Sequence, residues 1–161
     1  MVVRTGSKAV DPDACPEVDV GIPEIDAEHR QLVNHYNALI QALDEGNDVT
    51  AFGLSFYSLV LRVRQHFASE ERLMKETGYP HLARHRAEHQ KLLATAEDFL
   101  SRMMAEYEKY DCSAVAKYFK YWLLDHVTQH DRTFADFALP RINTAYKPMP
   151  LMPGVAGIAR S

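Results

Sequence analysis

The sequence has very little cysteine, no long apolar run and no apolar core near its start. Cys15 and Cys112 are its two cysteines. They lie too far apart in the sequence for a thiolate metal motif or a redox pair, so we expect two free thiols in a reducing compartment. Without an apolar run of membrane-spanning length or the apolar core of a signal peptide, the sequence predicts a cytoplasmic protein with no membrane span.

Positive charge is also scarce. The chain carries 18 Lys and Arg against 22 Asp and Glu, a net charge of -4 at pH 7. No expected helix gathers basic residues on one face, which argues against nucleic-acid binding. The length of 161 residues and the ordinary composition predict one globular domain with a sizeable core.

Apolar residues recur with helical spacing in four long segments, and no alternating strand pattern competes with them. Short connections make neighbouring helices antiparallel, so the predicted fold is all-α, an up-down-up-down antiparallel four-helix bundle. Capping and turn residues predict where each helix begins and ends. The expected helices run from Pro23 to Gly46, from Thr50 to Gly78, from Pro80 to about Tyr110, and from an N-cap at Ser113 to Pro140.

The bundle accounts for residues 21–140 and leaves a segment on each side. Residues 1–20 contain Pro12 and Pro16 and are expected to form an extended N-terminal arm. Residues 141–161 are rich in proline and glycine and are expected to be irregular. The apolar residues of this tail leave open whether it docks on the bundle or stays disordered.

Five of the eight histidines fall on the apolar stripes of the expected helices: His29, His66, His85, His89 and His126. A single histidine in a core is ordinarily a hydrogen-bonded structural residue. Five on four inward faces need another explanation, because each buried imidazole without a partner costs on the order of 1–3 kcal/mol. Metal coordination removes this cost by using the lone pairs. His35 and His81 fall off the stripes and are expected at the surface.

The segment from residue 66 to residue 89 carries two spaced pairs, His66-x-x-x-Glu70 and His85-x-x-x-His89. Residues four apart project from the same face of a helix. Gly78-Tyr79-Pro80 lies between the pairs and predicts a tight turn, so the two pairs face each other across a helical hairpin. Glu70 is then a buried carboxylate, which is best explained as a ligand, whereas Glu71 is expected to face solvent.

The acidic partner on the last helix is ambiguous. His126 and Asp131 are five residues apart, about 140° around an ideal helix, whereas His130 is four residues from His126 and fits the simple spacing better. Either Asp131 reaches round the helix or the helix is locally widened there. Spacing alone leaves both possibilities open.

Five imidazoles and two carboxylates exceed what one ion accepts, and they suit a pair of ions bridged by the carboxylates. Nitrogen-rich coordination without thiolate fits iron, with zinc, manganese and copper as alternatives. Ferritin-like di-iron bundles use Glu-x-x-His motifs. This sequence contains no Glu with His three residues later, which argues against that class.

The order of these residues resembles the hemerythrin family, in particular its single-domain bacterial form. The resemblance covers roughly Val20 to Leu139 and rests on His29, His66-x-x-x-Glu70, His85-x-x-x-His89 and His126-x-x-x-x-Asp131, flanked by Gly78-Tyr79-Pro80 and Trp122. It favours Asp131 over His130.

The resemblance implies a non-haem di-iron centre with an oxo or hydroxo bridge. His85, His89 and His126 would hold one iron, His29 and His66 the other, and Glu70 and Asp131 would bridge both. The second iron would keep an open position for dioxygen. Candidate walls for a dry oxygen pocket are Ile25, Leu32, Trp122 and Leu123.

The function implied is reversible dioxygen binding for oxygen storage, transport or delivery, in a protein that is not an enzyme. We expect a monomer, with dioxygen as ligand and an oxygen-using enzyme as a possible client. One alternative is a di-iron peroxidase or nitric-oxide-handling enzyme, which needs a proton donor such as Tyr36, Tyr121 or His130. The other is an oxygen or redox sensor module, which in this family is usually fused to a signalling domain that we do not find here.

Overall fold

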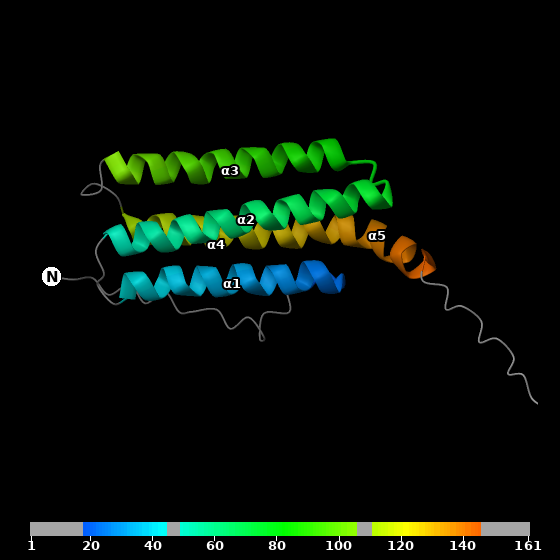
Figure 1. Ribbon diagram of the computed structural model, residues 1–161, viewed down its shortest axis with the longest axis horizontal. Coiled ribbons are helices and arrows are strands. Elements are labelled where there is room, and N and C mark those ends of the chain that lie inside the picture. The colour runs from blue at the N-terminus through cyan, green and yellow to red at the C-terminus, as the bar shows by residue number, and fades with distance from the viewer. Residues whose placement is uncertain (1–17, 45–48, 106–110, 146–161) are drawn as a thin grey trace, which may run out of the picture.

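Four helical rods pack side by side in an antiparallel bundle (Figure 1). The computed structural model describes residues 18–44, 49–105 and 111–145. Within these ranges every regular element is helical, which confirms the predicted fold class. The elements are α1 (Pro23–Asp44), α2 (Val49–Thr77), α3 (Leu82–Ala105), α4 (Cys112–Asp125), the π-helical segment η3 (His126–Asp131) and α5 (Arg132–Ala145).

The last three elements form one continuous rod, so the predicted fourth helix is interrupted by six residues of π-helix. The described part of the predicted arm comprises Val18, Asp19 and Val20, and the two valines are buried against the bundle. The remainder of the arm, including Cys15, and residues 146–161 of the tail lie outside the described residues. The division into arm, bundle and tail therefore stays a prediction.

The predicted start of the third helix at Pro80 is wrong by two residues. Gly78 ends α2 with a φ of 67°, a left-handed conformation that glycine adopts without steric cost. The amide of Tyr79 then donates to the Met74 carbonyl at 2.8 Å, and the amide of Leu82 donates to the Tyr79 carbonyl at 3.3 Å. This second bond closes a further turn through Pro80, which delays α3 to Leu82.

The predicted cap of the fourth helix is also corrected. Asp111, not Ser113, is the N-cap of α4, and its side chain accepts a hydrogen bond from the amide of Ala114 at 3.0 Å. A carboxylate at this position is favoured both as an acceptor and by the helix dipole.

Pro140 does not end the helix as predicted, because α5 continues through it to Ala145. The ring lies on the exposed side of the helix, and the last turns of α5 bend away from the bundle axis (Figure 1). Arg141 holds this turn, because its guanidinium donates to the Phe137 carbonyl at 2.6 Å and lies 3.5 Å from the centre of the Phe137 ring.

The interior contains two apolar cores. The large core includes Leu39, Phe52, Phe56 and Phe119, and the small core includes Ile25, Met74 and Phe134. Along each helical rod, the buried polar residues fall between residues of one core and residues of the other. The bundle therefore holds a polar layer between two apolar ones.

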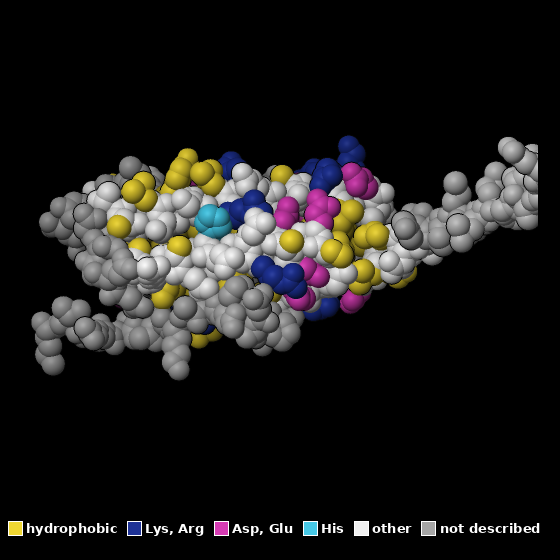
Figure 2. Space-filling view, turned by 60° about the horizontal axis from the view of Figure 1, so that its bottom comes forward, with side chains coloured by type: hydrophobic (Ala, Val, Ile, Leu, Met, Phe, Trp, Pro, Cys, Tyr) yellow, Lys and Arg dark blue, Asp and Glu magenta, His cyan; other side chains and the backbone are white. Residues whose placement is uncertain are grey.

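The face of the bundle in Figure 2 carries basic and acidic side chains intermixed, with no broad area of one sign. This pattern is typical of a solvated surface. Among the described residues, no helix combines the length and the hydrophobicity needed to cross a membrane.

Candidate metal centre

Seven buried histidine, aspartate and glutamate side chains converge in the polar layer, and they form two clusters. One cluster contains Glu70, His85, His89, His126 and Asp131, and the other contains His29, His66 and Asp131. Within each cluster the potential ligand atoms lie within 4.8 Å of one another. The structure thus brings together all seven residues that the sequence selected. We call these seven residues the cage.

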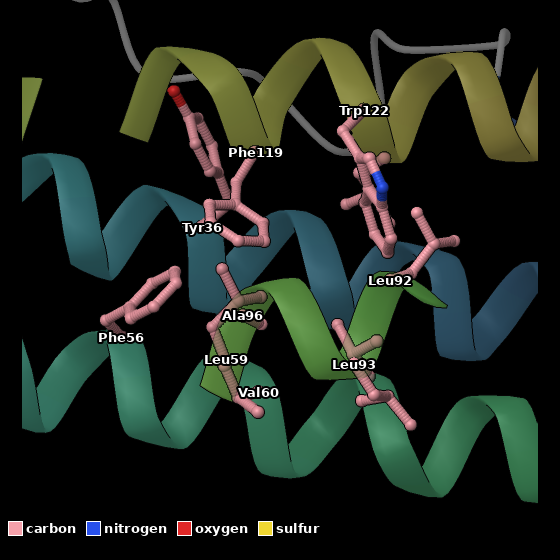
Figure 3. Close-up of a pocket in the computed structure, with 11 residues that line it drawn as sticks. Tyr36, Phe56, Leu59, Val60, Leu92, Leu93, Ala96, Phe119 and Trp122 are labelled. Atoms are coloured by element: carbon pink, nitrogen blue, oxygen red, sulfur yellow. The ribbon is translucent and has the colours of Figure 1, made fainter. Parts of the chain in front are cut away.

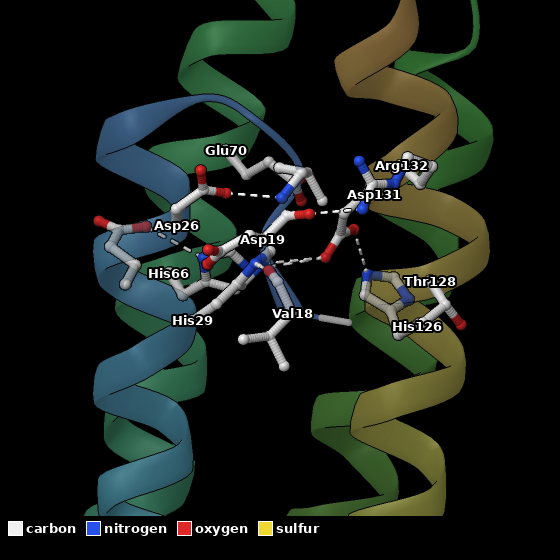
Figure 4. A network of polar contacts seen from close by, with 12 residues as sticks. Val18, Asp19, Asp26, His29, His66, Glu70, His126, Thr128, Asp131 and Arg132 are labelled. Atoms are coloured by element: carbon white, nitrogen blue, oxygen red, sulfur yellow. Dashed lines mark hydrogen bonds and ion pairs between the residues drawn. The ribbon is translucent and has the colours of Figure 1, made fainter. Parts of the chain in front are cut away.

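Asp131 belongs to both clusters and points one carboxylate oxygen at each (Figure 4). Its Oδ1 lies 3.1 Å from His126 Nε2 and 3.3 Å from His85 Nε2. Its Oδ2 lies 3.3 Å from His29 Nε2 and 3.9 Å from His66 Nε2. A carboxylate placed in this way is suited to bridge two ions.

Glu70 is fully buried and groups with the first cluster. Its Oε2 lies 3.2 Å from Nε2 of both His85 and His89. The Nε2 atoms of His85 and His126 each lie 3.0 Å from Nε2 of His89. Three imidazole nitrogens and a carboxylate oxygen therefore face a common point.

The π-helical segment explains how Asp131 joins this group. In η3 the backbone bonds span five residues, as in the bond from the Arg132 amide to the Val127 carbonyl. Residues five apart then lie on the same face, so His126 and Asp131 meet although an α-helix would separate them. The local widening that the sequence left open is present. His130, which simple spacing favoured, is partly exposed and lies outside both clusters.

Three cage histidines are held by a hydrogen bond from Nδ1, the ring nitrogen that faces away from the cage, to a protein oxygen. Nδ1 of His29 lies 2.6 Å from the Val18 carbonyl, Nδ1 of His66 lies 3.0 Å from Glu28, and Nδ1 of His89 lies 3.0 Å from Glu71. A carbonyl or carboxylate oxygen only accepts, so each Nδ1 donates a hydrogen and each Nε2 is directed inward. This arrangement is typical of metal-binding histidines.

These outer contacts are what the sequence analysis missed. The sequence placed Glu71 toward solvent, whereas its carboxylate is partly buried and accepts from both His89 and Arg86. Glu28 and the Val18 carbonyl received no role. The one available signal was adjacency, since Glu28 precedes His29 and Glu71 follows Glu70. Adjacency alone does not show which neighbouring helix the side chain reaches.

The segment before α1 is tied to the bundle by its own contacts. The carboxylate of Asp26 accepts from the amide of Val20 at 2.6 Å and from that of Gly21 at 3.1 Å. Arg30 bonds Asp19 at 2.6 Å, and Arg132 donates to the Asp19 carbonyl. Asp26 thus fixes the backbone that brings the Val18 carbonyl to His29.

Two cage histidines have raised pKa values in the protein without metal. Burial lowers the pKa of His66, but Asp131, Glu28 and Glu70 outweigh burial and raise it to about 9. Burial likewise lowers the pKa of His85, and Asp131 and Glu70 raise it to about 9. Two protonated imidazoles therefore balance the two buried carboxylates, a role that metal ions would take over.

The two buried carboxylates stay ionised for the matching reason. Burial raises the pKa of Asp131, but the imidazoles of His126, His29, His66 and His85 close to its oxygens hold it well below its usual value. Burial and the charge of Asp131 raise the pKa of Glu70, but His85 and His89 outweigh them and lower it. The cage thus presents anionic oxygens at neutral pH.

The cage passes a direct test of whether metal ions suit it. Several of its buried atoms have no hydrogen-bond partner: Nε2 of His29 and His66, and both carboxylate oxygens of Glu70 and Asp131. Each such atom costs on the order of 1–3 kcal/mol unless something satisfies it. Divalent cations with mixed nitrogen and oxygen ligands, iron among them, would satisfy all of these atoms together.

An apolar cavity of about 20 Å³ lies within the large core (Figure 3). Its lining includes Tyr36, Phe56, Trp122 and Leu123. Such a volume accommodates about one very small molecule. Phe67 stacks on His89 with ring centres 3.6 Å apart, at the boundary between the large core and the cage.

The four predicted wall residues of the oxygen pocket have different positions. Trp122 and Leu123 line the cavity. Leu32 belongs to the large core without lining the cavity, and Ile25 belongs to the small core. Whether these residues contact a bound gas stays a prediction.

Comparison with known proteins gives a consistent family. The family model for the hemerythrin HHE cation binding domain matches residues 20–138. A bacteriohemerythrin from Stenotrophomonas maltophilia is 28% identical over 127 residues, 79% of this chain and 81% of the relative. One from Methylococcus capsulatus is 28% identical over 109 residues, 68% of this chain and 82% of the relative.

Solved structures agree with the fold. A crystal structure of wild-type hemerythrin has 25% sequence identity and a TM-score of 0.70, covering 78% of this chain and 95% of that chain. The structure of a hemerythrin point mutant has 24% identity and a TM-score of 0.72, covering 81% of this chain and 98% of that chain.

Proposed function

This chain belongs to the hemerythrin family, and from that premise we propose that it binds dioxygen reversibly at a non-haem di-iron centre in the cage. The observation that carries the proposal is the pair of buried clusters sharing Asp131. Relatives of similar length are named bacteriohemerythrins, which supports the same reading.

The proposed ligand sets follow the two clusters. His85, His89 and His126 would hold one iron, and His29 and His66 would hold the other, with Asp131 and Glu70 shared by both. The distances from both Asp131 oxygens to histidine nitrogens support the shared role of Asp131. For Glu70, the support is that neither oxygen has a hydrogen-bond partner and that its charge acts on His66 in the other cluster.

Two ferrous ions bound there would supply the two electrons that reversible dioxygen binding needs. The second cluster offers fewer protein ligands than the first, so we assign the open position to the ion held by His29 and His66. Burial of every cage residue keeps water from this position, because the cage is enclosed by the two apolar cores.

We propose binding rather than turnover as the role of the site. A peroxidase needs a proton donor within reach of the substrate. Of the candidates, Tyr121 is 64% exposed on the outside of α4, Tyr36 lines the apolar cavity, and His130 borders a surface cleft. None of the three belongs to either cluster.

Reconstitution with ferrous iron tests the proposal. The protein loaded without oxygen should be nearly colourless, should develop visible absorption when oxygen is admitted, and should lose it again under vacuum over several cycles. About two irons per chain should be found by elemental analysis. Oxidation to a stable ferric form in the first cycle, with no recovery under vacuum, contradicts the proposal.

The location, the oligomeric state and the biological role of the protein are proposed on the same basis. We propose a cytoplasmic monomer that stores oxygen or delivers it to an oxygen-using enzyme. Sedimentation of the iron-loaded protein tests the oligomeric state, and transfer of oxygen to a purified oxygenase tests delivery.

A further inference from the structure

A surface cleft of about 300 Å³ lies next to the cage and is separated from it by His85. The cleft is formed by the turn before α3, the first turn of α3, the segment η3 and the start of α5. Its lining is rich in hydrogen-bond donors, and the proposed function uses none of them except His85. The lining includes Tyr79, Arg84, His85, Gln129, His130 and Thr133.

His85 presents an unpartnered nitrogen to this cleft. The residue is 3% exposed and directs Nε2 into the cage, toward Glu70 and Asp131. Among the described residues, no group accepts a hydrogen bond from Nδ1 of His85 or of His126, and of these two only His85 lines the cleft. A ligand in the cleft would give His85 the outer partner that His29, His66 and His89 obtain from protein oxygens.

Tyr79 adds a second donor. Its side chain is 8% exposed, lines the cleft and makes no hydrogen bond within the described part of the chain. Burial and the charge of Glu70 raise the pKa of its hydroxyl, so the hydroxyl stays protonated. A phenol and an imidazole N–H without acceptors thus border the same cavity, and both suit an oxygen acceptor.

Arg84 supplies positive charge at the rim. It forms no ion pair with any described residue, whereas Arg86, two positions on, bonds Glu71 at 2.7 Å. A guanidinium fork matches the two oxygens of a carboxylate.

We propose that this cleft binds a small organic carboxylate, held by Arg84 at the rim and by the N–H of His85 and the hydroxyl of Tyr79 at the floor. The volume exceeds what a bare inorganic ion fills, and the fork of Arg84 selects a planar anion. The bound carboxylate would lie behind His85 in the way that Glu71 lies behind His89.

Titration with acetate and with succinate tests the proposal, at constant ionic strength and with chloride as the reference anion. The readouts are the imidazole ¹⁵N shifts of His85 and the backbone amide shifts in the metal-free protein. We expect saturable shifts confined to the cleft, with dissociation constants of about 1–10 mM for the better probe. Absence of saturable shifts with both acids overturns the proposal.

Arg84→Gln should weaken carboxylate binding at least about tenfold, and Arg84→Lys should weaken it less, because lysine keeps the charge but loses the fork. Arg102→Gln, on the exposed far end of the same helix, is the matched control and should leave binding unchanged. Equal losses in Arg84→Gln and Arg102→Gln indicate general screening and contradict the proposal. Inorganic phosphate binding as tightly as the carboxylates contradicts the planar selection.

The same titration of the iron-loaded protein is a second, separate experiment. Acetate that coordinates iron directly would change the visible absorption and would not depend on Arg84, and this result alone, without shifts in the cleft, overturns the proposal. Because the main readout needs neither iron nor oxygen, failure of reversible oxygen binding and failure of carboxylate binding are observed independently.

Discussion

The cage and the large core lie next to each other in one bundle and contribute opposite terms to its free energy. The large core is built from aliphatic and aromatic side chains such as Leu39, Phe52 and Phe56, each essentially fully buried. Burying one such side chain stabilises the fold by roughly 1.5–3 kcal/mol. The cage buries charged groups, several with no hydrogen-bond partner, which destabilises the metal-free fold. The large core therefore maintains the fold, and the cage uses part of that stability to hold ligands in place.

The largest expected effect is at Asp131, the residue that both clusters share. Asp131→Asn removes the charge that faces both sets of histidines while keeping the side-chain size. We expect the iron content to fall from about two to fewer than one per chain, with the helical content unchanged. Elemental analysis and circular dichroism measure the two quantities.

Asp136→Asn is the matched control, because Asp136 is exposed on α5 and outside both clusters. It should retain both irons. If Asp131→Asn also retained two irons, the shared role of Asp131 would be wrong.

The second prediction concerns the large core. Phe56→Ala leaves a cavity at a fully buried position and should lower the free energy of unfolding by about 3–5 kcal/mol. The loss should be similar with and without metal, and the folded variant should still bind about two irons. Denaturant unfolding measures it, with Tyr57→Ala, exposed by 52%, as a control expected within about 0.5 kcal/mol of the parent.

If Phe56→Ala instead lost iron in proportion to its loss of stability, the large core and the cage would not be separable in function. The division of roles, in which the large core supplies stability and the cage binds metal, would then be wrong. The fold and the ligand assignment would be unaffected.

The third prediction is a pH dependence of the metal-free protein. His66 and His85 have pKa values of about 9 in the fold, above the ordinary value of 6.5. A histidine whose pKa is higher in the folded state than in the unfolded state stabilises the fold when it is protonated. This stabilisation is complete at pH values below the unfolded pKa and is lost as the pH rises through about 9. We expect the metal-free protein to lose on the order of 3 kcal/mol for each of these two histidines between pH 6.5 and pH 9.5.

Metal loading should show the same protons directly. When ions replace them, about two protons per chain should be released near pH 7, measurable in weakly buffered solution. In the loaded protein the alkaline loss of stability should be much smaller. Equal alkaline loss in both forms would mean that the protons are not in the cage.

The smallest expected effects are at the outer carboxylates. Glu71→Gln and Glu28→Gln each keep an oxygen near the histidine but remove its charge, and each should weaken metal binding about tenfold. Glu71 supports His89 in one cluster and Glu28 supports His66 in the other, so each variant should affect mainly one of the two ions. Competition with a chelator measures the two affinities.

Glu76→Gln on the exposed surface of α2 is the control and should change neither affinity. A uniform loss of both ions in Glu71→Gln and Glu28→Gln would show that the clusters do not act as separate binding positions.

The sequence predicted the fold and the members of the cage well, for a physical reason. Helical periodicity and ligand spacing are local, so His66 with Glu70 and His85 with His89 are fixed as pairs by the helix itself. Local rules failed where one residue has two options. Pro140 can end a helix or bend it, and Asp111 and Ser113 can both cap one, so the neighbouring packing decides.

By itself, the sequence determined that four amphipathic helices would bury five imidazoles and a carboxylate on their inner faces. Only the tertiary structure decided that Asp131 joins them, since this depends on the backbone bonds of η3. It also decided that Glu28 and Glu71 support histidines on other helices and that His85 borders a surface cleft. The period of a helix is written into consecutive residues, whereas contacts between helices depend on how separate faces pack.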